Sequence, residues 1–367
     1  MPSIAYPQTR RVDQVDEQFG VPVADPYRWL ENDVRSDADV AAWVAAEKKV
    51  TDAYLATLPG RSWFQTRIKQ LFDYERFGVP QRKGGRYFYT HNSGLQNQAV
   101  LFVREGAKGA GRVLIDPNNW AKDGATALSE WVPSEDGKLL VYGIQDGGTD
   151  WRTVKMLDVA TGKVLSDEVK WMKFSALAWA KDNSGFYYSR FPAPTGGQEF
   201  QALNENQAVY FHRLGTAQSE DRLIYATPET PKRGHFAQVT DDGRWLVITT
   251  TEGTDNRYEV TLVDLTAATP APRTIVKGLE NEWSLAGNRG TRFFWVTNKG
   301  APRMKIVTMD VAAASPVAAD LVGEDKATLE GAAIVGGQLF ASYLVDAKTE
   351  LRRFALDGKP IGTVATP

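Results

Sequence analysis

Alternating hydrophobic and polar positions predict short β-strands along most of the chain from about residue 77. The clearest stretch spans residues 131–169, where the apolar run Leu139 to Tyr142 follows the dipeptide Asp136-Gly137. Asp-Gly between hydrophobic runs is a typical signal for a tight turn between antiparallel strands. A Gly-rich bend and a second turn, Asp158 to Gly162, follow in the same stretch. The pattern therefore predicts an antiparallel meander of about four strands.

This meander occurs six times. The glycines of its first turn lie 47 to 58 residues apart, at Gly85, Gly137, Gly185, Gly243, Gly290 and Gly337. In four units an aspartate marks the second turn 20 or 21 residues later, at Asp158, Asp264, Asp310 and Asp357. Meanders with a period of roughly 40 to 50 residues are typical of propeller blades, whereas the turns of a β-sandwich come every 8 to 12 residues without a longer phase. We therefore predict a mainly β fold with about six propeller blades.

The first 75 residues carry a different pattern. Residues 1 to about 33 are expected to form an extended arm. From Ser36, a candidate N-cap, apolar residues recur at helical spacing as far as Pro59-Gly60, and a second helix is predicted from Ser62 to about Phe72. Helices this aromatic need a partner surface. We therefore predict two domains, an α-helical segment at 1–75 and a propeller at 76–367.

Two further features concern the propeller. The third unit contains an insertion, residues 191–207, which is expected to be an exposed loop. The sequence stops where a seventh blade could begin. Such a stop would leave an unpaired strand edge, which native proteins usually cover. We therefore expect a truncated propeller that is poorly soluble or oligomeric on its own.

Composition narrows the classes of function. The 43 basic and 45 acidic residues form no long block of one sign. The sequence therefore shows no basic stretch of the kind that binds nucleic-acid phosphates. No apolar run is long enough to span a membrane. With no cysteine and three histidines, the chain is expected to hold neither a metal nor a cofactor. The N-terminus lacks the apolar core of a signal peptide, which predicts a cytoplasmic protein or, alternatively, a mature periplasmic one.

Catalytic residue types are present without a catalytic pattern. The sequence has no G-x-S-x-G motif, and Ser93, the nearest approach to one, lies in a predicted hairpin bend. His91 lies in a polar bend, His212 lies in a strand where we expect it to bond a backbone group, and His235 precedes a strand. No phosphate-binding loop appears. These residues describe a scaffold and no catalytic centre.

Six blocks, taken in order, resemble the bacterial prolyl oligopeptidases. They are DPYRWLEN at 25–32, KGGRYFYTHNSGLQNQAVLFV at 83–103, GGTDWRTVKMLDVATGKVL at 147–165, VKWMKFSALAWAKDNSGFYYSRFP at 169–192, AVYFHRLGT at 208–216 and EGTDNRYEV at 252–260. Members of that family join a C-terminal α/β-hydrolase domain, with a Ser-Asp-His triad, to a seven-bladed β-propeller inserted after a helical N-terminal segment. The resemblance implies that residues 1–75 are this segment, which would pack on the hydrolase domain, and that about six of seven blades are present.

The resemblance also implies a function. Family members are serine peptidases that cleave short peptides after proline, and their propeller caps the active site and excludes folded proteins. The implied partners are a proline-containing oligopeptide and the C-terminal hydrolase domain of the same polypeptide, with no nucleic acid and no membrane. The parent enzyme is expected to be monomeric. Because the triad lies outside this sequence, the chain alone is expected to be inactive.

Three site residues follow from matching motifs. Phe174, in VKWMKFSALAW, matches an aromatic residue that lines the subsite next but one before the proline, and Thr254, in EGTDNR, matches a neighbour in that subsite. Asp150, in GGTDW, matches an acidic residue near the interdomain surface that interacts with an arginine of the hydrolase domain. The residues also have ordinary structural interpretations. Phe174 could be a strand-core aromatic, Thr254 a loop residue and Asp150 a turn cap.

Two other classes of function compete with this interpretation. A free-standing propeller could bind a protein partner through one face, but the aromatic helices at 36–72 argue against it. A propeller glycosidase would place carboxylates around a central tunnel. No acidic residue repeats at one inward-pointing blade position in this sequence, which argues against that class.

Overall fold

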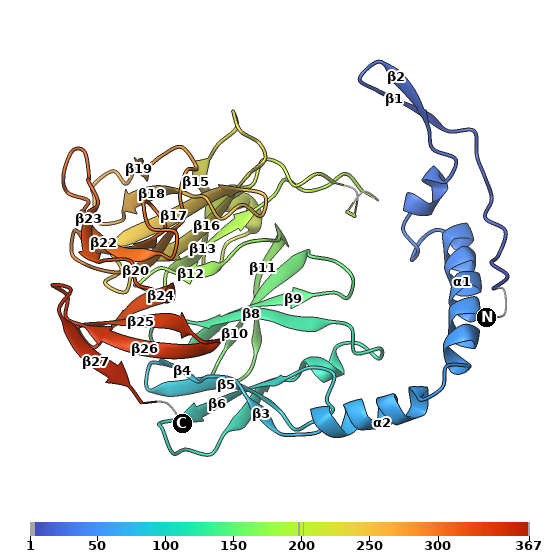
Figure 1. Cartoon of the computed structure of the whole chain (residues 1–367), viewed down its shortest axis with the longest axis horizontal. Helices are drawn as coiled ribbons and strands as arrows, with labels where there is room; N and C mark the ends of the chain where they lie inside the picture. Colours follow the sequence, from blue (N-terminus) through green and yellow to red (C-terminus); the bar gives the residue numbers. More distant parts are fainter. Residues whose placement is uncertain (1–3, 197–198, 201, 366–367) are drawn as a thin grey trace. The chain divides into compact units, whose positions relative to one another are not determined.

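The computed structural model describes residues 4–196, 199–200 and 202–365, and this part of the chain is mainly β (Figure 1). It divides into two compact units. The helical unit contains the described residues up to Phe77, together with His91–Gln96 and those of 194–202. The propeller unit contains the other described residues. The predicted division into domains 1–75 and 76–367 stays a prediction.

The helical unit begins with a hairpin that the sequence did not reveal. Strand β1 (Val15–Gln18) pairs antiparallel with β2 (Val21–Ala24) around Phe19 and Gly20, whose φ angles are 54° and 77°. A 3-10 turn, η1 (Arg28–Glu31), follows. Only an extended arm was expected here, because Phe-Gly is not one of the usual hairpin dipeptides.

Both predicted helices form, as α1 (Ala38–Ala56) and α2 (Arg61–Phe72). The N-cap of α1 is Asp37, whose carboxylate accepts hydrogen bonds from the backbone N–H groups of Asp39 and Val40 at 2.9 and 3.1 Å. The prediction of Ser36 as the N-cap was wrong, because its hydroxyl donates to the Asp33 carbonyl at 3.3 Å. Gly60, with a φ of 80°, separates the two helices.

Six sheets follow, and they confirm the predicted count of about six blades. The first contains β3 (Arg76–Phe77), β4 (Gln81–Lys83), β5 (Arg86–Asn92), β6 (Val100–Glu105) and β7 (Arg112–Ile115). The second contains β8 (Ala127–Pro133), β9 (Leu139–Gln145), β10 (Arg152–Asp158) and β11 (Val164–Met172), and the third β12 (Leu177–Trp179), β13 (Gly185–Arg190), β14 (Ala208–Arg213) and β15 (Arg222–Ala226). The fourth contains β16 (Arg233–Val239), β17 (Trp245–Glu252), β18 (Glu259–Asp264) and β19 (Pro272–Val276). The fifth contains β20 (Trp283–Arg289), β21 (Arg292–Thr297), β22 (Lys305–Asp310) and β23 (Ala319–Val322), and the sixth β24 (Thr328–Val335), β25 (Gln338–Val345), β26 (Lys348–Phe354) and β27 (Pro360–Val364). Short 3-10 turns, η2 (Pro117–Asn119) and η3 (Gln218–Glu220), lie between strands.

Each of the last five sheets is an antiparallel meander in which the order of strands in space is their order in sequence. First strands of successive sheets lie side by side, β8 beside β12, β12 beside β16 and β20 beside β24. The first strand of a blade is therefore its inner strand, as a propeller requires.

The repeated turns lie where the sequence predicted them. Between first and second strands, Gly137 and Gly243 adopt φ angles of 67° and 72°, which glycine reaches without steric cost. Between third and fourth strands, the carboxylate of Asp158 accepts from the Thr161 N–H at 2.8 Å. Gly185 differs, because Asn183 takes the positive φ there, at 58°, while a Cβ on Gly185 would lie 2.1 Å from the His212 carbonyl oxygen.

These turns divide the propeller into two faces. Because strands alternate in direction, both repeated turns of a blade lie at one end of its strands, which we call the turn face. The segments at the opposite strand ends form the loop face and include 146–151, 173–176, 191–193, 203–207 and 253–258. The insertion 191–207 was expected to be exposed. Residues 197, 198 and 201 lie outside the described residues, and its two ends, Phe191 and Gln207, are buried.

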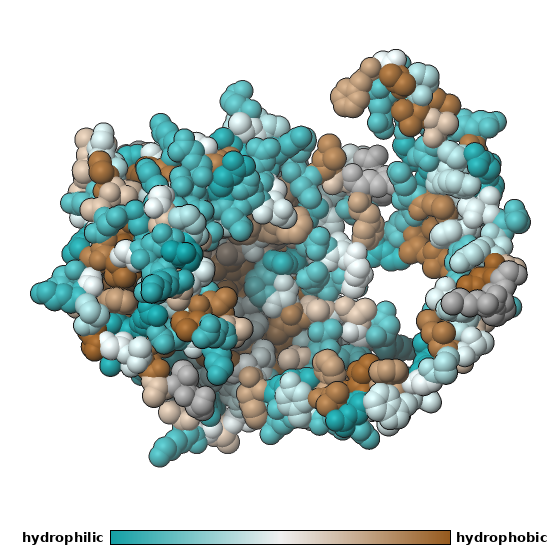
Figure 2. Space-filling view, viewed as in Figure 1, coloured by the Kyte–Doolittle hydropathy of each residue, from teal (hydrophilic) through white to brown (hydrophobic). Residues whose placement is uncertain are grey.

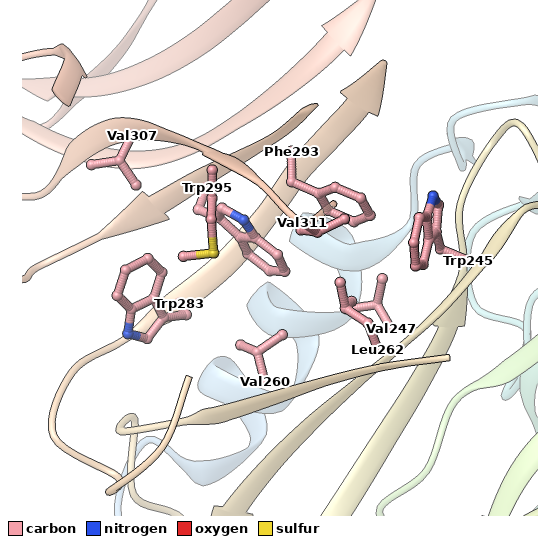
Figure 3. Close-up of a cluster of buried hydrophobic side chains, with 10 residues drawn as sticks. Trp245, Val247, Val260, Leu262, Trp283, Phe293, Trp295, Val307 and Val311 are labelled. Atoms are coloured by element: carbon pink, nitrogen blue, oxygen red, sulfur yellow. The ribbon is translucent and has the colours of Figure 1, made fainter. Parts of the chain in front are cut away.

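The hydrophobic core lies between neighbouring blades. In the cluster drawn in Figure 3, Trp245 and Val247 of β17 face Phe293 and Trp295 of β21, and the Trp283 and Trp295 rings meet edge to face at 6.4 Å. Similar clusters fill the other four junctions between consecutive sheets. Each blade is therefore held by the side chains of its neighbours, because burying apolar surface is the main favourable contribution to folding.

Candidate functional site

The loop face of the propeller unit contains a pocket of about 810 Å³. It is built on β16, β17 and β20, with walls from the loops after β11, β13 and β17. Its lining combines aromatic rings with polar and basic groups, among them Phe174, Phe191, Gln207, Arg233, Phe236, Thr254, Tyr258 and Trp283. Pockets of this size and mixed lining are typical of ligand sites.

Phe174 lies in the loop after β11 and lines this pocket. Its side chain is 43% exposed, and its φ angle of 50° places the backbone in the left-handed region. The interpretation of Phe174 as a strand-core aromatic is therefore wrong. A phenylalanine held at positive φ is unfavourable and persists only when its surroundings stabilise it.

Thr254 lines the same pocket from the loop after β17. Two contacts in this loop order it, since the Thr251 hydroxyl donates to the Asp255 carbonyl at 2.5 Å and the Arg257 guanidinium binds the Asp255 carboxylate at 2.9 Å. The side-chain hydrogen bond from Arg257 is the main reason that the pKa of Asp255 is lowered to about 2. The structure thus brings Phe174 and Thr254 together, although 80 residues separate them in sequence.

Asp150 lies on the loop face but does not line the pocket. It is exposed in the loop between β9 and β10, and that turn is capped by Asp146, whose carboxylate accepts from the Gly147 N–H at 2.9 Å. The side chain of Lys173 lies within reach of its charge. Burial lowers the pKa of Lys173, and the negative charge of Asp150 opposes this effect. Asp150 is thus linked to the residue that precedes Phe174.

Lys173 itself has an aromatic setting. The side chain is buried, and its ammonium lies 4.0 Å from the centroid of the Trp151 ring and 5.5 Å from that of Phe191. A cation over an indole face is attracted by the ring quadrupole, and more strongly where water is excluded. Lys173 is therefore anchored on Trp151 and does not itself line the pocket.

Sequence reasoning missed Gln207, Phe236 and Arg233. Phe236 is an exposed phenylalanine on β16, between the buried residues His235 and Ala237. An apolar residue on the polar side of a period-two pattern is a signal that could have identified it. The Arg233 guanidinium binds the Glu259 carboxylate at 2.8 Å, a pairing between strands that no local pattern reveals.

None of the three histidines lines the pocket. His212 is fully buried, and its Nδ1 and Nε2 lie 2.7 Å from Asp221 and 3.2 Å from Asp167, so the expected bond to a backbone group was wrong. Burial would lower the pKa of His212, but the hydrogen bond and charge of Asp221, aided by Asp167, outweigh it and raise the pKa. His235 lies within β16 and does not precede it. Its ring lies 2.9 Å from the Thr250 hydroxyl, and burial lowers its pKa to about 4.

The described part of the chain gives no sign of a metal site or a membrane-spanning helix. Among these residues, no group of three or more His, Cys, Asp or Glu side chains is arranged to hold a metal ion. None of the helices in the described ranges combines the length and the apolar character needed to cross a bilayer. A propeller with an aromatic and polar pocket on one face has the geometry typical of a ligand-binding domain.

The family of the chain follows from comparison with known proteins. A family model described as the prolyl oligopeptidase N-terminal β-propeller domain matches residues 7–367. The chain belongs to this family, and the resemblance found in the sequence is confirmed.

Individual relatives agree with this assignment. The chain is 35% identical, over 99% of its length, to a prolyl endopeptidase of Elizabethkingia meningoseptica, and 30% identical, over 88%, to a dual function macrocyclase-peptidase of Galerina marginata. A solved structure from a study of two prolyl endopeptidases matches with a TM-score of 0.75 and 49% identity, covering 99% of this chain and 52% of that one. Prolyl oligopeptidase B of Galerina marginata, bound to a 35mer hydrolysis and macrocyclization substrate, matches with a TM-score of 0.84 and 28% identity. The match covers 98% of this chain and 54% of that one. The chain spans about half the length of the curated relatives it matches.

Proposed function

We propose that this chain is the N-terminal and propeller portion of a serine peptidase that cleaves short peptides after proline. The observation that carries the proposal is the loop-face pocket, in which Phe174 and Thr254 meet as the family motif implies. The names of the relatives support the same reaction, since they are prolyl endopeptidases and oligopeptidases.

In this proposal the propeller shapes access and one substrate subsite. The pocket takes the side chain two positions before the proline, between the rings of Phe174 and Phe236. Apolar walls favour an apolar or aromatic side chain there, because its transfer from water is favourable. Arg233 supplies a polar group that can orient the peptide backbone. The attacking serine and its histidine base are supplied by the C-terminal α/β-hydrolase domain of the same polypeptide.

The helical unit has a surface suited to that partner domain. Helix α2 has no buried residue and exposes an apolar stripe at helical spacing, Phe64, Ile68, Leu71 and Phe72. Apolar residues can be followed along α1 and α2 in Figure 2. An exposed apolar stripe of this kind marks an interaction surface. We propose that the hydrolase domain covers it.

A direct test compares two proteins with one substrate. This chain and the complete polypeptide encoded by its gene are each assayed with a chromogenic Gly-Pro peptide, with and without a serine-directed inhibitor. The proposal expects inhibitor-sensitive cleavage by the complete polypeptide and none by this chain. Cleavage by the chain alone would reveal a nucleophile within it, and no cleavage by either protein would remove the proposal.

Two finer expectations belong to the same proposal. The complete enzyme is expected to be a monomer, which light scattering measures directly. It is expected to act in the cytoplasm, and the alternative is the periplasm. Activity in the periplasmic fraction of the source cells would decide for the alternative.

A further inference from the structure

We propose that Gln207 is a positioning residue for the substrate pocket. Its buried amide fixes the backbone of Lys173 and Phe174 and thereby sets the Phe174 ring against the peptide. The inference rests on the proposed function, because it concerns the side chain that the pocket admits. It adds a residue that neither the motifs nor the helical and strand patterns single out.

The Gln207 side chain joins three segments of the propeller unit. Its Nε2 group donates to the carbonyl oxygens of Lys173 and Phe174 at 3.0 and 3.1 Å. Its Oε1 atom accepts from the backbone N–H of His235 at 2.5 Å. Because carbonyls only accept and the N–H only donates, these partners fix the orientation of the amide. The loop after β11 is thus tied to the inner strand β16 through one side chain.

Burial makes these bonds consequential. Gln207 is 2% exposed, so water cannot replace a lost partner. A buried polar group without a partner costs more free energy than a hydrogen bond contributes. An apolar residue at position 207 would leave two carbonyls and one N–H unsatisfied. The backbone at 173–174 would then move toward water or toward a new partner.

The two residues held by Gln207 have opposite roles. The Lys173 ammonium lies over the Trp151 ring, which anchors that side chain outside the pocket lining. Phe174 follows at a φ of 50°, and this left-handed backbone directs its ring to the pocket lining. The amide of Gln207 binds the carbonyls of both residues. It therefore stabilises the backbone reversal that separates the anchored residue from the substrate-facing one.

The position of Gln207 in the chain adds a consequence. It is the last residue of the insertion 191–207, immediately before β14. Its three hydrogen bonds fasten this end of the insertion to the backbone around the pocket.

The test uses the complete polypeptide and two chromogenic peptides. Gly-Pro is too short to reach the pocket, whereas Phe-Gly-Pro places an aromatic side chain two positions before the proline. The readout is the ratio of kcat/KM for the long peptide to that for the short one. Gln207→Leu is expected to lower this ratio about tenfold, mainly through KM, because Phe174 is no longer held. Gln207→Glu keeps the acceptor for the His235 N–H but loses the donors, and it should lower the ratio in the same direction.

A control comes from another amide bridge, which is partly buried. The Gln98 Nε2 group donates to the Gly124 carbonyl at 3.1 Å, far from the pocket in sequence and in sheet. Gln98→Leu removes a comparable bond, and it is expected to alter the ratio by less than about twofold. If Gln207→Leu does not fold, Gln207→Glu provides the comparison with the control.

A double-mutant cycle separates positioning from general stability. Phe174→Ala should itself lower the ratio, and adding Gln207→Leu should lower it by less than about a further twofold. If Gln207→Leu lowers kcat/KM equally for both peptides, or retains its full effect beside Phe174→Ala, the positioning role is wrong. If the unsubstituted polypeptide cleaves neither peptide, the proposed function fails and this inference fails with it.

Discussion

His212 and His235 are two buried imidazoles in one propeller whose pKa values are shifted in opposite directions. His212 lies between the carboxylates of Asp167 and Asp221, which raise its pKa. His235 contacts the hydroxyls of Thr227 and Thr250, and burial lowers its pKa to about 4. Folding therefore favours the proton on one ring and disfavours it on the other.

This difference predicts a stability optimum in pH. In the unfolded chain both rings titrate near about 6.5. Because the pKa of His235 is depressed in the folded state, its contribution to the free energy of unfolding is fully present above pH 6.5. This contribution is lost as the pH falls toward 4, and the total loss is about 3 kcal/mol. Because the pKa of His212 is raised in the folded state, its contribution to the free energy of unfolding is fully present below pH 6.5. This contribution is lost as the pH rises through the raised pKa.

Urea unfolding across pH measures both limbs of this profile. His235→Gln is expected to flatten the acid limb between pH 6.5 and 4 and to leave the alkaline limb. His212→Gln should lower stability by about 3 kcal/mol or more near pH 6, since it leaves two buried carboxylates without their cation. An unchanged acid limb in His235→Gln would show that other groups cause it.

At single positions, the sequence indicated which residues lie at the pocket better than it indicated their hydrogen-bond partners. Motif matching placed Phe174 and Thr254, and the structure brings them to one pocket. Asp150 lies outside the pocket lining, and its role toward a hydrolase domain stays a prediction. The partners of Gln207 and His212 could not be predicted, because these hydrogen bonds join residues up to 45 positions apart across different strands. Local sequence patterns do not predict such long-range pairings.

At the scale of elements, one carboxylate joins three blades. Glu135, on the turn face, binds Lys83 of the first sheet and Lys181, whose ammonium lies 2.7 Å away beside the third sheet. Its backbone N–H also donates to the Asn183 side chain at 2.8 Å. Burial tends to raise the pKa of Glu135, but hydrogen bonds and charges from both lysines more than offset this and lower it.

Neutralising the Glu135 carboxylate should weaken the contact between the first three sheets. Glu135→Gln is expected to lower the free energy of unfolding by about 1 kcal/mol at low salt, and by less at high salt, because the pairs are partly exposed. Asp52→Asn is the matched control, since the exposed Lys48–Asp52 pair lies within one helix. Equal losses for the two variants in urea unfolding would contradict a role for Glu135 between blades.

The start of α1 gives a second prediction at this scale. Asp37→Ala should lower helix stability by about 1 kcal/mol, because the carboxylate satisfies two free N–H groups of the first turn. Ser36→Ala should change it by less than about 0.5 kcal/mol. Hydrogen exchange at Asp39 and Val40 distinguishes the variants, and faster exchange in Ser36→Ala alone would restore the serine as the cap.

Most elements could be predicted because their signals are local. Asp-Gly turns recur in phase, and Pro59-Gly60 lies between the two helices, so blades and helices follow from short segments of sequence. The β1–β2 hairpin escaped because its turn places Phe19 at a φ of 54°, which is uncommon for an aromatic residue. The N-cap was misplaced by one residue because serine and aspartate are both good caps.

At the scale of the whole molecule, the exposed stripe on α2 governs the behaviour of this chain in solution. Ile68 and Leu71 are each more than half exposed. The chain alone is expected to associate as its concentration rises, because unburied apolar surface favours self-contact. Ile68→Glu should reduce this association, measured by light scattering.

A control for this effect lies in the other unit. Val317, between β22 and β23, is also strongly exposed but lies outside the stripe. Val317→Glu is expected to leave association nearly as it is. A monodisperse monomer for the unsubstituted chain at all concentrations would show that the stripe does not self-associate.

The separation of turn face and loop face has a consequence for how the domain can change over generations. The residues that shape each blade, such as Asp158 and Gly243, lie at one end of the strands. The pocket lies at the other end. A substitution in a loop such as 253–258 can alter ligand preference while the turns that fix strand pairing stay intact. Selection for new ligands can therefore act on one side of the propeller without reducing its capacity to fold.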